Sequence, residues 1–121
     1  MRIVSHLLLL LLVAVCLTVS CDKLTSVEKD GVTVSLVEDG IRIKNESEST
    51  IGYMAIERET ANVIDWAPLC TPDNEIKIDK STVVDYSSIT NYTEGKEILV
   101  YFWQCPYSNG YGIHSIVITG K

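Results

Sequence analysis

Short segments in which apolar and polar residues alternate constrain the fold of this chain more than any other feature. Val32–Leu36 and Ile41–Lys44 both alternate, and the turn signal Glu38-Asp39-Gly40 lies between them. A period of two predicts half-buried strands, and an Asp-Gly pair between two such runs predicts a hairpin. A two-residue loop, Asp39-Gly40, or a four-residue loop, Val37–Gly40, would place the apolar residues of both strands on the same face.

Five further apolar segments of strand length follow, separated by polar turns. They are Ile51–Ile56, Ile76–Ile78, Val83–Tyr86, Ile98–Cys105 and Ile113–Thr119. The segment Thr60–Ala67 fits either a short strand or one helical turn that packs Trp66 onto a sheet. Seven to eight short strands with turns about every 8–12 residues predict an all-β fold, namely a small antiparallel β-sandwich of immunoglobulin-like type.

The first twenty-one residues predict export. Arg2 supplies one positive charge, and the six leucines of Leu7–Leu12 are followed by small and hydroxylated residues up to Ser20. A cationic start, a short apolar middle and a small residue before the cleavage point are typical of a secretory signal peptide, here residues 1–20. The apolar run Leu7–Val19 is too short to span a bilayer alone, because a spanning helix needs about 20 apolar residues.

The residues Leu17-Thr18-Val19-Ser20-Cys21 resemble the lipobox of bacterial lipoproteins, in which a small residue precedes an invariant cysteine. The resemblance implies that the chain is cut before Cys21, that the thiol is diacylated, and that Cys21 anchors the domain to a bacterial membrane. Residues 21–30 would then be the lipidated cysteine and a polar tether, and residues 31–121 the domain, in the periplasm or outside the cell.

Two features of this region leave alternatives open. Thr18 stands where the lipoprotein family prefers Leu, so ordinary secretion, with cleavage near Ser20 and a free Cys21 thiol, is the alternative. Cys16 fits the lipobox less well than Cys21, because the bulky Val15 precedes it. The residue after the cysteine, an aspartate, resembles a signal that retains some enterobacterial lipoproteins in the inner membrane. Other bacteria use this position differently, so either membrane is possible.

The cysteine count predicts one disulfide. Of the four cysteines, Cys16 leaves with the signal peptide and Cys21 is the lipidation candidate, which leaves Cys70 and Cys105. In an oxidising compartment, an even pair of this kind predicts a disulfide bond. Two cysteines without further ligands are also too few for a zinc site.

The mature part of the chain is acidic. Residues 21–121 contain nine Lys and Arg against sixteen Asp and Glu, which gives a net charge of −7 for a length that suits a single domain. Nucleic acids and anionic lipid headgroups are therefore not expected as partners, because both need a basic patch on the protein.

The sequence predicts no catalytic residue, no metal site and no cofactor. His114 is the only histidine after the signal peptide; Cys105 or Ser108 could pair with it, but the disulfide explains Cys105 and no nucleophile motif surrounds Ser108. The acidic groups Asp73-Asn74-Glu75 and Glu38-Asp39-Gly40 lack the spacing of a calcium loop, and turns favour the same residue types. The chain is therefore not expected to be an enzyme.

Aromatic residues near the C-terminus are the one feature with a predicted binding role. Alternation along Ile98–Cys105 places Phe102 on one face and Tyr101 and Trp103 on the other. If Phe102 faces the core, the outward residues and two tyrosines of the next loop form a candidate patch: Tyr101, Trp103, Tyr107 and Tyr111. The alternative is that Trp103 fills the core or is covered by Thr60–Pro72.

Two hypotheses of different classes follow. The first is a non-enzymatic, membrane-anchored domain that binds another protein of the cell envelope, and a free strand edge would favour it. The second is a lipoprotein that binds a glycan or another small ligand against its aromatic loop, and an exposed Trp103 beside Tyr107 would favour that one.

Overall fold

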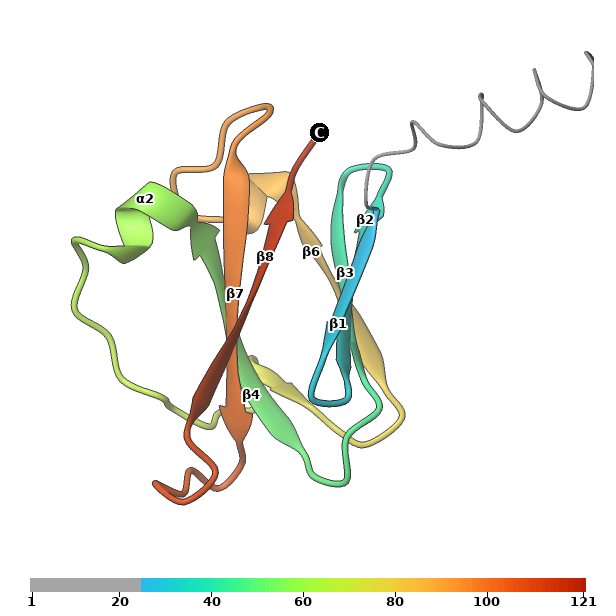
Figure 1. Ribbon diagram of the computed structural model, residues 1–121, viewed down its shortest axis with the longest axis vertical. Helices are drawn as coiled ribbons and strands as arrows, with labels where there is room; N and C mark the ends of the chain where they lie inside the picture. The colour runs from blue at the N-terminus through green and yellow to red at the C-terminus, as the bar shows by residue number, and fades with distance from the viewer. Residues whose placement is uncertain (1–24) are drawn as a thin grey trace, which may run out of the picture.

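The structure of this protein is a computed structural model that describes residues 25–121, so the predicted signal peptide and Cys21 lie outside the described residues. Eight strands form two antiparallel four-stranded sheets in this range (Figure 1). The predicted all-β sandwich is therefore confirmed. No helix within residues 25–121 is both long enough and apolar enough to cross a membrane.

The two sheets are interleaved along the chain. The first has the order β1 (Ser26–Lys29), β2 (Val32–Val37), β3 (Gly40–Asn45), β6 (Ser81–Asp85). The second has the order β5 (Glu75–Ile76), β4 (Ile51–Glu57), β7 (Glu97–Gln104), β8 (Ile113–Thr119). Because β3 lies beside β6 and β4 lies beside β7, the chain crosses between the sheets, as in immunoglobulin-like sandwiches.

The core lies between the sheets and consists of the inward-facing alternate residues of both. These side chains are at most 3% exposed: Val32, Val34, Ile41, Ile43, Ile98, Val100, Phe102, Ile116 and Ile118. A fully buried aliphatic or aromatic side chain contributes about 1.5–3 kcal/mol relative to an exposed one, so these alternating positions determine which face of each strand turns inward.

In the hairpin β2–β3, the apolar side chains of both strands lie on the same face of the sheet, as predicted. Leu36 pairs with Ile41 and Val37 pairs with Gly40, which leaves a two-residue loop of Glu38 and Asp39. The predicted four-residue loop, Val37–Gly40, requires the same register, with Leu36 opposite Ile41. The structure adds the pair of Val37 and Gly40, which shortens the loop to two residues. A Cβ atom on Gly40 would lie 2.1 Å from the carbonyl oxygen of Val84 on β6, so only glycine fits at this position.

The predicted tether is wrong over residues 26–30. Ser26–Lys29 forms β1 and pairs with β2 along its length, and Val27 packs against the core. Asp30 and Gly31 connect the two strands with positive φ angles of 52° and 83°, as expected for both residues of a type I′ turn. The sandwich therefore begins at Ser26, immediately after the first described residue.

The ambiguous segment Thr60–Ala67 is mostly neither strand nor helix. A single helical turn, α2 (Arg58–Ala61), begins earlier than predicted, and an irregular segment of residues 62–74 follows it. Glu57 caps α2: its carboxylate accepts a hydrogen bond from the backbone N–H of Thr60 at 2.7 Å. That bond is the largest cause that lowers the pKa of Glu57 below 4.5. A short 3₁₀ turn, η1 (Tyr86–Ser88), follows β6.

Candidate functional site

A disulfide attaches the irregular segment after α2 to the second sheet. We call residues 62–74 the strap; in Figure 1 it descends from α2 beside β4 and β7. Cys70 of the strap is bonded to Cys105, just beyond the end of β7, with their Cα atoms 5.8 Å apart. The predicted disulfide is confirmed.

Trp103 lies on the outer face of β7, opposite the core, but it is only 1% exposed. The ring of Trp66, from the strap, lies 5.6 Å from the ring of Trp103 and 4.6 Å from that of Tyr101, centroid to centroid. The indole N–H of Trp103 donates to the carbonyl oxygen of Leu69 at 3.1 Å. Trp103 is therefore covered by the strap, as in the alternative in which Thr60–Pro72 shields it.

Gly52 of β4 lies beneath the buried indole. It pairs with Trp103 in the sheet, and a Cβ atom on Gly52 would lie 2.4 Å from the Nε1 atom of Trp103. The same Cβ atom would lie 3.0 Å from the sulfur of Cys105. The indole therefore fits in a slot between the backbone of β4 and the strap, and this packing leaves no room for a ligand over Trp103.

The two loop tyrosines do not join Tyr101 and Trp103 in one patch. The ring of Tyr111 lies 4.7 Å from that of His114, and His114 stacks at 5.2 Å on Phe102, which faces the core. Tyr111 therefore lies toward the inner face of the sheet, opposite Trp103. Burial, and secondarily the charge of Asp30, raise the pKa of Tyr111. Tyr107 is 40% exposed and is the most accessible of the four residues.

His114 is held in position by two acceptors. Its Nδ1 atom lies 2.8 Å from a carboxylate oxygen of Asp30, and its Nε2 atom lies 3.0 Å from the carbonyl oxygen of Tyr111. A carbonyl oxygen can only accept, so Nε2 carries a proton and donates it. Because the sulfur of Cys105 is bonded to Cys70, it offers no thiol that His114 could activate.

Two groups of potential metal ligands have structural roles instead. Cys70, Cys105 and Glu75 bring ligand atoms close together, but the two sulfurs are bonded to each other and cannot act as thiolate ligands. In Asp73-Asn74-Glu75, which lacks the spacing of a calcium loop, the side-chain oxygen of Asn74 accepts from the backbone N–H of Thr71 at 2.8 Å. That oxygen therefore closes the turn of the strap.

The outer edge of β6 is open. The backbone N–H of Asn45 donates to the carbonyl oxygen of Lys80, so these two residues form a hydrogen-bonded pair that continues the β3–β6 ladder. Because hydrogen-bonded pairs alternate along an antiparallel ladder, the backbone N–H and C=O groups of Thr82 and Val84 also point toward β3. The backbone N–H and C=O groups of Ser81 and Val83 consequently point away from the sheet. Among residues 25–121, no backbone hydrogen bond beyond that ladder involves either of them.

Comparison with protein-family models, with curated proteins and with solved structures found no match to this chain. The assignment of a site therefore depends on the geometry alone. That geometry comprises an aromatic cluster closed by the strap, a disulfide that holds the strap, and an open strand edge on the opposite sheet.

Proposed function

We propose that this chain is an exported lipoprotein, anchored through Cys21 to a bacterial cell membrane, whose immunoglobulin-like sandwich binds another protein of the cell envelope without catalysis. The observation that supports the binding role is the open edge of β6. Val83 on that strand is 48% exposed, and Ile78 just before the strand is 46% exposed. An unpaired edge with apolar side chains beside it is a template for strand addition by a partner.

The edge has features of a specific rather than an indiscriminate docking strand. It is five residues long, and its exposed side chains alternate along the outer face, at Ser81, Val83 and Asp85. A charged residue on an edge strand limits unspecific pairing with other chains. A partner strand would gain main-chain hydrogen bonds from this edge and would take its specificity from contacts with Val83.

The alternative function, binding of a glycan or small ligand by an aromatic loop, has weaker support. Flat aromatic surfaces contribute to binding when they are accessible. Trp103 is covered by the strap and Tyr111 faces the other side of the sheet, so Tyr107 is the residue of the predicted patch that remains most exposed. We therefore favour a protein partner over a glycan.

Site-specific crosslinking in the host tests the role of the edge. A photo-crosslinking amino acid at Ser81, which is exposed, should give an adduct of one defined mass in intact cells. The same amino acid at Thr33, a half-buried position on β2 in the middle of that sheet, should not. Equal adducts at both positions, or none at Ser81, would contradict strand addition at β6.

Proline substitutions separate binding from folding. Val83→Pro removes an N–H that points away from the sheet, so the β3–β6 ladder keeps its hydrogen bonds and the adduct at Ser81 should be lost. Thr82→Pro removes an N–H that faces β3 and should instead lower the stability of the domain. An adduct that persists in a folded Val83→Pro variant would exclude main-chain pairing at this edge.

The intact mass of the protein from host membranes tests the anchor. The expected mass is that of residues 21–121 plus two or three acyl chains and minus two hydrogens for the Cys70–Cys105 bond. An unmodified chain in the soluble fraction would exclude the lipoprotein proposal and leave Cys21 as a free thiol of a secreted domain.

A further inference from the structure

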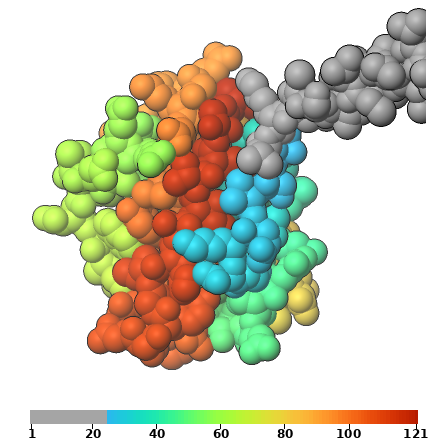
Figure 2. All heavy atoms as spheres, in the orientation of Figure 1, coloured from blue at the N-terminus to red at the C-terminus, as the bar shows by residue number. Residues whose placement is uncertain are grey.

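The edge strands β1 and β8 of the two sheets lie next to each other on one side of the sandwich (Figure 2). At one end the ammonium group of Lys29 donates to the carbonyl oxygen of Ser115 at 3.3 Å, which bridges the two strands. Toward the other end lies a hollow of about 450 Å³. We call this hollow the seam.

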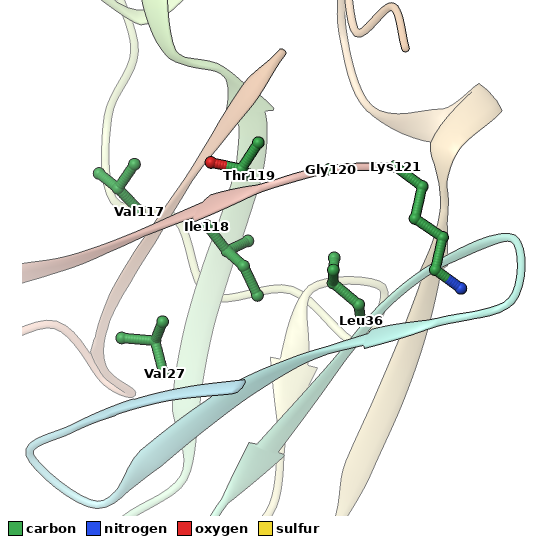
Figure 3. Close-up of a pocket in the computed structure, with 7 residues that line it drawn as sticks. All are labelled: Val27, Leu36, Val117, Ile118, Thr119, Gly120 and Lys121. Atoms are coloured by element: carbon green, nitrogen blue, oxygen red, sulfur yellow. The ribbon is translucent and has the colours of Figure 1, made fainter. Parts of the chain in front are cut away.

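The lining of the seam is mostly apolar. Val27 projects from β1 and Leu36 from β2, and Ile118 points toward Leu36 from β8, while the side chain of Val117 lies on the other face of β8, at the rim of the hollow (Figure 3). Of the lining residues within 25–121, Lys121 alone is charged, although the mature chain is strongly acidic. Among the described residues, no acidic side chain lines the seam, so its surface suits an uncharged apolar group better than a cation.

The chain enters the domain beside the seam. The backbone N–H of Leu36, a lining residue, donates to the carbonyl oxygen of Thr25 at 2.8 Å. Cys21 is four residues upstream of Thr25, and four residues reach at most about 14 Å at 3.3–3.6 Å each. Any group on the thiol of Cys21 is therefore confined to the neighbourhood of the seam.

We propose that the seam takes part of one acyl chain attached to Cys21 whenever the protein is outside a bilayer. The proposal rests on the lipoprotein function proposed above and adds a binding site for an acyl chain of the anchor. It requires no chemistry beyond lipidation, because the chain is held by burial alone. A short tether gives the attached chain an effective concentration in the millimolar range, which free lipid does not reach at equal stoichiometry. In a membrane the same chain inserts beside the other acyl chains.

An alkyl group attached to Cys21 of the mature chain tests this proposal directly. Residues 21–121 contain the whole core, and Cys21 is their one free thiol once Cys70 and Cys105 are paired. The thiol is alkylated with a decyl maleimide or, as the control, with the methyl reagent, and backbone amide chemical shifts are compared by NMR. Shift changes for decyl alone are expected at Val27, Leu36 and Val117. Shifts that are identical for the two reagents would overturn the proposal.

Two aspartate variants locate the effect. Leu36→Asp places a charge in the lining and should abolish the decyl-specific shifts, and Val27→Asp repeats the test from β1 if Leu36→Asp does not fold. The matched control is Val63→Asp in the strap, which packs on the second sheet; Val63 is 82% exposed and is not part of the seam lining, so this variant should leave the shifts unchanged. Decyl-specific shifts that survive both seam variants would place the chain elsewhere.

Further measurements separate the other occupants and the two proposals. Equimolar decanol added to the Cys21→Ala chain should give no shift at the seam; equal shifts would mean that the seam takes free lipid and would overturn the role of the anchor. Decyl-specific shifts that grow with protein concentration would indicate a second copy and would also overturn it. The alkylation experiment does not depend on processing in the host, so it tests the seam alone. Failure of the lipoprotein proposal is detected separately, as an unmodified mass of the protein from the host.

Discussion

Asn45 connects three segments through one buried amide. It has no exposed surface, and its Nδ2 atom donates to the carbonyl oxygens of Ser49 at 2.8 Å and Ile76 at 2.9 Å. Its side-chain oxygen accepts from the backbone N–H of Ser47 at 3.0 Å. We predict that Asn45→Ala lowers the free energy of unfolding by about 1–3 kcal/mol, because buried partners lose their hydrogen bonds. Asn45→Asp should be worse still, since it replaces two donors with a buried charge. Urea denaturation measures both, and an Asp variant as stable as the wild type would contradict this role.

Gly52 makes a second single-residue prediction possible. A Cβ atom there would lie 2.4 Å from the Nε1 atom of Trp103, in a slot that the strap closes from the other side. Gly52→Ala should therefore push the indole outward and lower the stability by about 1–3 kcal/mol, the usual cost of overpacking. Tryptophan emission should shift to the red as the rings gain water. The exposed Gly110, where a Cβ atom would have no contact closer than 3.8 Å, provides the control as Gly110→Ala.

At the scale of elements, the strap depends on the disulfide. The bond between Cys70 and Cys105 closes a loop with a sequence separation of 35 residues. The chain-entropy estimate for a loop of this length is about 4 kcal/mol of stabilisation. We predict that the double variant Cys70→Ser/Cys105→Ser loses stability of that order and shows red-shifted tryptophan emission, because Trp66 no longer covers Trp103. Thermal unfolding and fluorescence measure the two effects. An unchanged emission maximum would mean that aromatic packing alone holds the strap.

The cap of α2 gives the domain a pH-dependent element. Hydrogen bonding from Thr60 lowers the pKa of Glu57 below 4.5, so the ionised carboxylate is favoured in the folded state. Its contribution to stability is present above pH 4.5 and is lost as the pH falls through the lowered value. Glu57→Gln should therefore destabilise the domain at pH 7 and have little effect near pH 2. Denaturation midpoints across that range check this, with the exposed Glu59→Gln as the control. A difference that persists at low pH would assign the effect to packing.

The elements differ in how far the sequence predicts them, for physical reasons. Ile113–Thr119 is predicted to the residue, because its alternation reflects one buried face. The strand β1 is missed because Val27 is its only apolar residue, although the Asp30-Gly31 pair after it is a strong hairpin signal. The cover over Trp103 depends on contacts between segments distant in the chain. The local sequence pattern could therefore give this cover only as one of several alternatives. The disulfide could be predicted because only two cysteines remain after Cys16 and Cys21 are assigned.

At the scale of the whole molecule, the acidic charge and the proposed acyl anchor would act in opposite directions at a membrane. The net charge of −7 on residues 21–121 repels anionic headgroups, and an acyl chain supplies attraction that does not depend on charge. We predict that the unacylated mature chain does not bind anionic vesicles even in about 0.01 M salt, where screening is weak. The acylated chain should bind neutral vesicles more tightly than anionic ones at that salt.

Raising the salt separates the two effects. At about 0.15 M the Debye length falls to about 8 Å, so the preference of the acylated chain for neutral vesicles should shrink while its binding persists. Vesicle sedimentation measures both quantities. Binding of the unacylated chain to anionic vesicles at low salt would reveal a basic surface that the overall charge conceals. The anchor would then not be the sole attachment, and the open β6 edge could face the bilayer instead of a protein partner.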